Sequence, residues 1–139
     1  AGALNLHAGC VACDGRGLLI LGPSGSGKSA LALQLMALGC DLVSDDRTDL
    51  ALHDGRLIAS PPRATSGLIE ARGIGILCAR TVASAEVAWA VDLGTVETER
   101  LPPDRHICVC DVTLPLLHGQ STPHFPAAIL QLLRGGRAD

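Results

Sequence analysis

The chain has 139 residues, of which 47% are hydrophobic and 18% charged, with a net charge of −3 at pH 7. This length fits one domain around a single buried core, and the apolar fraction argues against disorder. Because there is no basic surplus and the only aromatic residues are Trp89 and Phe125, composition excludes nucleic acid as a partner. The apolar runs have the length of strands, so neither a membrane span nor a signal peptide is expected.

The first half of the chain predicts short strands on both sides of a glycine-rich segment and a helix. The helix is expected from Ser29 to Leu38, where leucines at positions 31, 35 and 38 recur on one face and Gly39 is suited to end it. Tight turns are expected at Asp14-Gly15 and Asp54-Gly55. Strands are expected at residues 4–6, 10–13, 17–21, 41–44, 48–53 and 56–60.

The second half begins with a loop at residues 61–67 and an apolar stretch at 67–76 that contains three glycines. Strands are expected at 87–93 and 106–114, and a closing helix at 126–134. Strands therefore dominate beside two helices. This pattern predicts an α/β fold with a mixed sheet, in which residues 1–139 form a single domain.

A glycine-rich segment links the strand at residues 17–21 to the first helix. Glycines let backbone N–H groups turn towards an anion, and the helix N-terminus adds partial positive charge. Lys28, the only lysine of the chain, is expected to reach the outer phosphates, and the Ser29 hydroxyl to bind Mg²⁺. The alternative is a glycine-rich turn without a ligand. The segment matches the P-loop pattern G-x-x-x-x-G-K-[ST] with the residues Gly22, Pro23, Ser24, Gly25, Ser26, Gly27, Lys28 and Ser29.

Two adjacent carboxylates, Asp45 and Asp46, follow the apolar strand at 41–44. P-loop enzymes carry a metal-binding carboxylate at such a strand end. One of the pair can hold Mg²⁺, directly or through water, while the other accepts a proton from the substrate. The alternative is a surface pair that caps a turn.

Four segments together resemble the HPr kinase/phosphorylase family, in the order in which that family has them. The resemblance covers nearly the whole chain as the family's C-terminal catalytic domain, without its N-terminal regulatory domain, so we expect a naturally short form or a truncated chain. The last segment is similar to the family pattern E-[IV]-R-G-x-G-[IL]. The segments are His7-Ala8-Gly9-Cys10, the P-loop, Val43-Ser44-Asp45-Asp46 and Glu70-Ala71-Arg72-Gly73-Ile74-Gly75-Ile76.

The resemblance implies a fold like that of phosphoenolpyruvate carboxykinase and ATP-dependent phosphorylation of a serine on the phosphocarrier protein HPr, within phosphotransferase-system and carbon-metabolism regulation. It also implies a reverse reaction in which phosphate attacks phosphoserine and releases pyrophosphate. By the same resemblance, Asp46 is the proton acceptor, and His7 and Lys28 are active-site residues. Ser29 and Glu70 bind Mg²⁺, and we add Asp45 from its position.

Glu70 and Arg72 are two residues apart, so on a strand they share one face, where they can serve the metal and a phosphate. The alternatives are a surface ion pair for these two and an ordinary histidine at position 7. Arg100 matches a family arginine that acts on the transferring phosphate, and Arg105 is a rival for that role. Gln120 stands where the family usually carries arginine, which predicts a weak reverse reaction.

The six cysteines are expected to be reduced thiols of a cytosolic protein. Cys10 and Cys13 are three apart on a strand and point to opposite faces, which argues against a shared metal. Cys108 and Cys110 share a face but have no partner motif. We therefore expect these four cysteines to serve as small buried apolar side chains.

The leading hypothesis is a Mg²⁺·ATP-dependent protein-serine kinase acting on HPr. Its alternatives are a P-loop kinase of a small metabolite and a nucleotide-dependent switch or binding module. The second carboxylate argues against a pure binder. The shortage of basic residues argues against the arginine-bearing lid that a small-metabolite kinase would need. The sequence is compatible with a homo-oligomer and indicates no particular oligomeric state.

Overall fold

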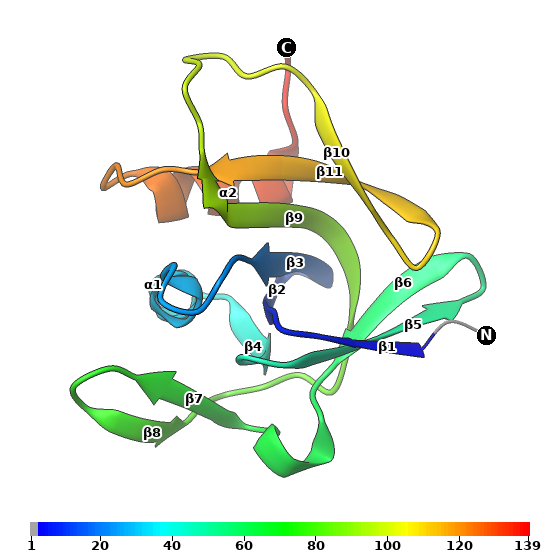
Figure 1. Cartoon of the computed structure of the whole chain (residues 1–139), viewed down its shortest axis with the longest axis vertical. Coiled ribbons are helices and arrows are strands. Elements are labelled where there is room, and N and C mark those ends of the chain that lie inside the picture. The colour runs from blue at the N-terminus through cyan, green and yellow to red at the C-terminus, as the bar shows by residue number, and fades with distance from the viewer. Residues whose placement is uncertain (1–2) are drawn as a thin grey trace.

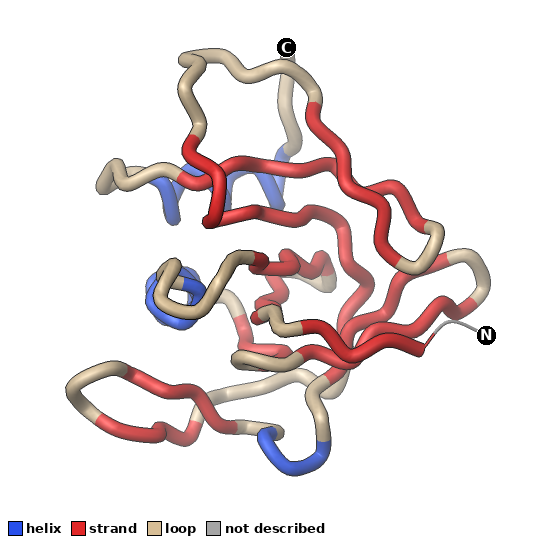
Figure 2. The backbone as a smooth tube through the Cα atoms, in the orientation of Figure 1, coloured by secondary structure: helices blue, strands red, loops and turns tan. Residues whose placement is uncertain are grey.

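The computed structural model describes residues 3–139, which form a mixed α/β fold dominated by strands (Figures 1 and 2). The helices are α1 (Lys28–Ala37), α2 (Phe125–Gly135) and the short 3₁₀ helix η1 (Arg63–Thr65). The strands are β1 (Ala3–Leu6), β2 (Gly9–Cys13), β3 (Arg16–Leu21), β4 (Asp41–Ser44), β5 (Thr48–His53), β6 (Arg56–Ser60), β7 (Leu68–Ala71), β8 (Gly75–Cys78), β9 (Ala85–Val96), β10 (Arg105–Val109) and β11 (Val112–Gly119).

One large sheet of nine strands curls through the molecule (Figure 1). Its main path runs β1-β5-β6-β9-β3-β2-β4, and the β10–β11 hairpin joins it along β9. β9 pairs in parallel with both β3 and β11, whereas the remaining pairs are antiparallel. The predicted mixed sheet is therefore confirmed, and β9 is the strand that joins its parts.

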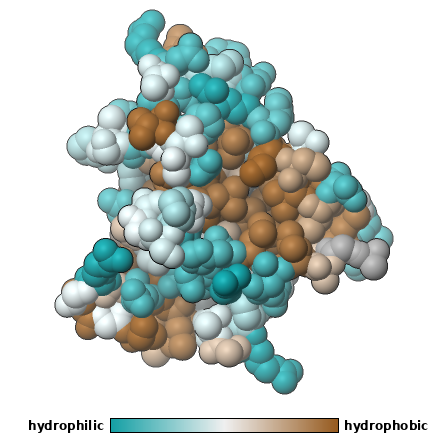
Figure 3. Space-filling model, in the orientation of Figure 1, coloured by the Kyte–Doolittle hydropathy of each residue, from teal (hydrophilic) through white to brown (hydrophobic). Residues whose placement is uncertain are grey.

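The two faces of this sheet carry separate apolar clusters. Side chains of β2 and β3, such as Val11 and Ile20, pack on one face against Leu35 of α1 and Ile129 of α2. The cluster on the other face, which includes Leu19, contains no residue of either helix and is closed by the curl of the sheet. Figure 3 shows an apolar hollow over the middle of the sheet, flanked by hydrophilic residues. Both helices thus lie on the same face of the sheet.

Local turn chemistry explains much of the chain path. The Asp-Gly pairs at 14–15 and 54–55 both have positive φ at both residues, as a two-residue hairpin turn of type I′ requires. Gly39 has a φ of 110° and ends α1, with its N–H bonded to Met36 O. The helix ends one residue earlier than expected, because Leu38 lies at its C-cap and is 43% exposed.

Two predicted segments differ from the structure. The single strand expected at 106–114 is the β10–β11 hairpin, which turns at Cys110 and Asp111 with φ values of 50° and 64°. The stretch at 67–76 contributes to a second hairpin, β7–β8, whose two strands form a sheet of their own. Within the part of the chain that the structure describes, no helix is long and apolar enough to cross a membrane.

The cysteines divide into buried and accessible groups. Cys10, Cys13 and Cys40 are buried, as expected, and Cys10 and Cys13 belong to the clusters on opposite sheet faces. Cys78 and Cys108 are exposed and Cys110 is half-buried, so the expectation that Cys108 and Cys110 are buried is wrong. Cys110 also lies in a turn rather than on a strand face with Cys108. Burial raises the pKa of both the Cys10 and the Cys40 thiol to about 12.

This division predicts a two-phase reaction with a thiol reagent at pH 8. Cys78 and Cys108 should be labelled within minutes in the native protein, because they are exposed. Cys10 and Cys40 should stay unlabelled until the protein unfolds, since a thiol with a pKa near 12 holds almost no thiolate at that pH. Peptide mapping by mass spectrometry after timed labelling measures both groups, and rapid native labelling of Cys10 would contradict the described packing of β2.

Candidate active site

The P-loop turns from the end of β3 into the first turn of α1. Gly25 and Gly27 adopt φ values of 83° and 99°, a conformation that glycine takes without strain. Among the described residues no side chain caps α1, and its first turn contains no acidic residue. The unbonded N–H groups and the helix dipole therefore face the loop, an arrangement that favours a phosphate.

Lys28 lies inside the loop rather than in solvent. Its residue is 8% exposed, and its Nζ donates hydrogen bonds to Gly22 O at 2.7 Å and Pro23 O at 3.0 Å. These two carbonyls hold the ammonium group at the mouth of the loop. The described position places a single positive charge where the outer phosphates of a nucleotide would lie.

The Asp45 carboxylate joins the P-loop to the β7–β8 hairpin. Ser29 Oγ donates to Asp45 Oδ1 at 2.7 Å, and the backbone N–H of Glu70 donates to Asp45 Oδ2 at 3.0 Å. Asp45 is 8% exposed, so this carboxylate is fixed by its partners rather than solvated. The predicted proximity of Ser29, Asp45 and Glu70 is present in the structure.

Asp46, the next residue, points the other way and pairs with His7. His7 Nε2 and Asp46 Oδ1 lie 2.8 Å apart, and the Asp46 side chain is 67% exposed. Asp46 has a φ of 66°, which turns its carboxylate away from that of Asp45. The two adjacent aspartates therefore have different environments: Asp45 is buried against the P-loop serine, and Asp46 is held by a histidine and open to an incoming group.

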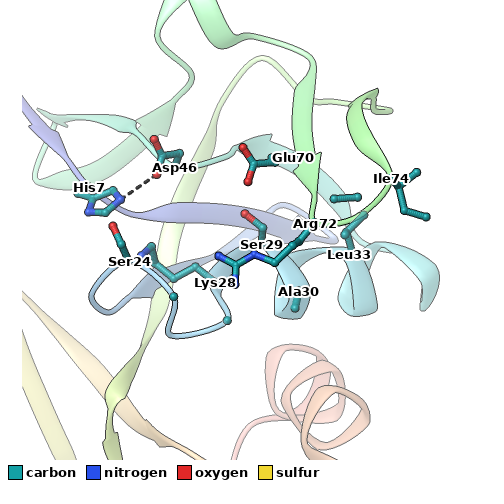
Figure 4. A pocket seen from close by; sticks show the side chains of 13 residues that line it. His7, Ser24, Lys28, Ser29, Ala30, Leu33, Asp46, Glu70, Arg72 and Ile74 are labelled. Atoms are coloured by element: carbon teal, nitrogen blue, oxygen red, sulfur yellow. Dashed lines mark hydrogen bonds and ion pairs between the residues drawn. The ribbon is translucent and has the colours of Figure 1, made fainter.

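These groups surround one open cavity of about 570 Å³, which we call the P-loop cavity. Figure 4 shows the carboxylates of Asp46 and Glu70 across the cavity from Lys28. Its lining residues are His7, Ser24, Gly25, Gly27, Lys28, Ser29, Ala30, Leu33, Asp46, Glu70, Ala71, Arg72 and Ile74. The structure thus brings the P-loop, Asp46 and the glycine-rich hairpin to one cavity, while Asp45 does not line it and contacts it through Ser29 and Glu70.

The donor set fits a magnesium ion bound together with a nucleotide. Within residues 3–139 no cluster of three or more His, Cys, Asp or Glu side chains could hold a metal ion without further ligands. Mg²⁺ in proteins needs fewer, because one or two carboxylates, substrate phosphates and water complete its octahedral shell. The Ser29 hydroxyl and the Asp45 carboxylate, with Glu70 across the cavity, are oxygen ligands of that kind.

Arg72 reaches the cavity from a turn and not, as was expected, from a strand. β7 ends at Ala71, so Arg72 lies in the turn before β8 and does not share a strand face with Glu70. Both side chains nevertheless line the same cavity, because the tight turn folds Arg72 back over it (Figure 4).

Neither of the two arginines suggested for the transferring phosphate lines the P-loop cavity. Arg100 is exposed in the loop after β9. Arg105 forms a two-pronged ion pair with Glu97, at 3.1 Å from Nε and 3.0 Å from Nη2, which lowers the pKa of the Glu97 carboxyl. Gln120 also lies outside this cavity and lines a neighbouring one, so its position gives the sequence argument about the reverse reaction no geometric support.

Leu33 and Ile74 are cavity residues that the sequence did not single out. Leu33 is four residues after Ser29 on α1 and therefore on the same helix face, a spacing that could have indicated it. Ile74 is 78% exposed at the tip of the β7–β8 hairpin. Together they give the cavity an apolar side opposite His7.

The chain is similar in sequence to proteins that are already known. Residues 1–88 match the family described as HPr Serine kinase C-terminal domain. The HPr kinase/phosphorylases of Clostridium botulinum (strain Eklund 17B) and Clostridium tetani are each 49% identical over 72 residues, which is 52% of this chain. That match spans 24% of each relative, so the chain aligns with about a quarter of their length.

A solved structure matches over almost the whole chain. The Hpr(Ser) kinase/phosphatase from Coxiella burnetii superposes with a TM-score of 0.79 at 28% identity, and the match covers 94% of each chain. The overall arrangement of helices and strands described above is therefore already known in a protein of that name. The chain is a member of the HPr Serine kinase C-terminal domain family.

Proposed function

We propose that this protein is a Mg²⁺·ATP-dependent kinase that phosphorylates a serine of the phosphocarrier protein HPr. The observation that carries the proposal is the separation of two groups of side chains on different sides of one cavity. Lys28 and the Ser29–Asp45 pair lie on the nucleotide side, and the His7–Asp46 pair lies on the open side. A phosphate donor and a hydroxyl acceptor can thus meet between a fixed cation and an accessible base.

The proposed chemistry is an in-line transfer. The acceptor seryl oxygen attacks the γ-phosphorus, the bond from that phosphorus to the β,γ-bridging oxygen breaks, and ADP leaves. Asp46 accepts the seryl proton, and His7, at 2.8 Å, orients its carboxylate. Lys28 and Arg72 stabilise the charge on the transferring group. Bound Mg²⁺ would neutralise phosphate charge, held by Ser29, Asp45 and Glu70.

The shape of the cavity favours a protein acceptor over a small metabolite. The cavity is open, and two apolar side chains of the β7–β8 hairpin beside it are largely exposed, Ile74 at 78% and Ile76 at 62%. Exposed apolar side chains at the rim of a polar site are suited to contact another protein's surface. The proposal treats residues 1–139 as one catalytic domain, arranged around its P-loop like phosphoenolpyruvate carboxykinase.

The test is incubation with ATP, Mg²⁺ and purified HPr, followed by intact-mass analysis of HPr. We expect HPr to gain one phosphate, and an HPr variant with alanine at the acceptor serine to gain none. ATP consumption without phosphate on HPr would contradict the proposed acceptor and favour a small-metabolite kinase. Nucleotide binding without any turnover would instead favour a switch module.

We also expect the reverse reaction to be slower than the forward reaction. Phosphate and phosphoserine are two anions that must come together, and the P-loop cavity offers them only two permanently basic described side chains, Lys28 and Arg72. The measurement is release of pyrophosphate from phospho-HPr and phosphate, compared with forward transfer at matched enzyme concentration. Equal rates in the two directions would overturn this expectation.

A further inference from the structure

A second cavity of about 170 Å³ lies beside the P-loop cavity, between the start of α1, the end of β9 and the segment that leads into α2. Its walls are apolar where Leu31, Leu93 and Phe125 face it. Its polar groups come from the P-loop, from α1 and from residues 120–122. None of the site residues assigned above depends on this cavity except through the P-loop itself.

One polar atom at this cavity has no partner in the protein. Ser26 lines the cavity, and its Oγ is the only buried side-chain nitrogen or oxygen of the described residues without a hydrogen bond. A buried hydroxyl without a partner costs about 1–3 kcal/mol. Because this oxygen is itself buried, rotation of the Ser26 side chain about χ1 would bring it to a group bound in the cavity and satisfy it.

Two side-chain amides lie at the same cavity. Gln34 is exposed on α1, one turn after Ala30, and no hydrogen bond of its amide is present among the described residues. Gln120 accepts a hydrogen bond from Thr122 Oγ1 at 3.3 Å through its Oε1, and its amino group has no described acceptor. Each amide therefore keeps hydrogen-bonding capacity for a polar, flat ligand that enters between the apolar walls.

The two cavities meet at the first turn of α1. Gly27 and Ala30 line both of them, so a molecule can extend from one to the other past the helix N-terminus. The P-loop cavity is lined by the Lys28 side chain and by the carboxylates of Asp46 and Glu70. A nucleotide whose terminal phosphate lies at Lys28 would therefore run its α-phosphate past Gly27 and its nucleoside into the second cavity.

We propose that the second cavity is the nucleoside site and that it selects adenine through the Gln34 and Gln120 amides. This inference rests on the proposed function, because it assigns the other end of the same nucleotide. A glutamine amide presents one donor and one acceptor, which pair in a bidentate manner with the N6 amino group and N7 of adenine. Guanine presents two acceptors, O6 and N7, at the same edge and loses one of these bonds.

The test compares MgADP, MgGDP and magnesium pyrophosphate by isothermal titration, without any acceptor protein. We expect ADP to bind at least about tenfold more tightly than pyrophosphate, because the base and ribose add apolar burial and hydrogen bonds. GDP should fall between them. Gln34→Leu and Gln120→Leu should each weaken ADP about two- to tenfold, the equivalent of one neutral hydrogen bond, and leave pyrophosphate unchanged.

Gln131→Leu is the matched control, since Gln131 is exposed on α2 and lines neither cavity. Ser26→Ala gives a second measurement. It removes the unpartnered hydroxyl, so the ligand-free protein should melt at the same or a higher temperature, while the melting shift caused by ADP becomes smaller.

Three results would overturn the nucleoside site. These are ADP binding no tighter than pyrophosphate, GDP binding as tightly as ADP, and an unchanged ADP affinity in both glutamine variants. In each of them pyrophosphate still binds and transfer to HPr is still measurable, so the proposed function stands. If neither ADP nor pyrophosphate binds, the P-loop assignment fails, and the proposed function fails with it.

Discussion

Lys28→Ala is expected to abolish phosphoryl transfer while the protein remains folded. Lys28 is the only lysine, and its Nζ is held at the mouth of the P-loop by Gly22 O and Pro23 O. Removing one preorganised hydrogen-bond donor that stabilises charge in the transition state costs about 10²–10³-fold in rate. Because Lys28 carries a full positive charge towards a phosphoryl group, we expect its removal to cost at least this much. Transfer to HPr, followed by intact mass, measures the loss.

The fold of this variant needs its own check, because the two carbonyls lose their donor. Their exposure to water at the loop limits the cost to roughly 1–3 kcal/mol, which circular dichroism and a melting curve will detect. Arg63→Ala is the control, as it removes an exposed cation in η1 away from the cavity. A folded Lys28→Ala protein with near-normal turnover would disprove the assignment of Lys28.

Asp46→Asn is expected to retain Mg²⁺·ATP and to lose about 10²–10⁴-fold in transfer, the usual contribution of a general base. An amide keeps the shape of the carboxylate and cannot accept the seryl proton. Asparagine also tolerates the φ of 66° at this position, so the backbone should stay as it is. Asp54→Asn is a close control, since Asp54 is exposed in a turn at a φ of 52° and lies outside the cavity.

Asp45→Asn should fail in a different way. Its carboxylate accepts hydrogen bonds from Ser29 Oγ and from the Glu70 N–H, so this variant should weaken Mg²⁺-dependent nucleotide binding and lower thermal stability. Titration with MgADP, run beside the transfer assay, separates the two aspartates. If Asp45→Asn is dead with normal binding and Asp46→Asn works, their roles are the reverse of those proposed.

The sequence predicted the parts of the fold that depend on short-range chemistry. The two Asp-Gly turns, Gly39 at the end of α1 and the P-loop between β3 and α1 all follow from residues within a few positions of one another. The P-loop follows from its own local pattern, whereas the expectation that His7, Glu70 and Arg72 join it came from the resemblance to a known family.

The parts that the sequence did not predict depend on contacts between distant segments or on turns without a typical signal. No residue pattern within or beside β9 indicates that this strand pairs with β3 on one side and with β11 on the other. Cys110 and Asp111 turn the chain at positive φ without the glycine that usually marks such a turn. The placement of Gln120 in a separate cavity likewise depends on how β11 and α2 pack beside α1.

The β7–β8 hairpin is a two-stranded sheet with no hydrogen-bonded partner strand among the described residues. It is held through Ile69, which is 1% exposed and packs in the cluster beneath α1, and through the bond from the Glu70 N–H to Asp45. A lone hairpin is marginally stable in water, so its amide hydrogens should exchange with solvent through local opening, well before the nine-stranded sheet unfolds. Asp45 thus contributes to the frequency of that opening through one carboxylate oxygen, while its other oxygen binds the P-loop serine. In the proposed kinase, this shared side chain would couple nucleotide occupancy to the access of an acceptor beneath the hairpin.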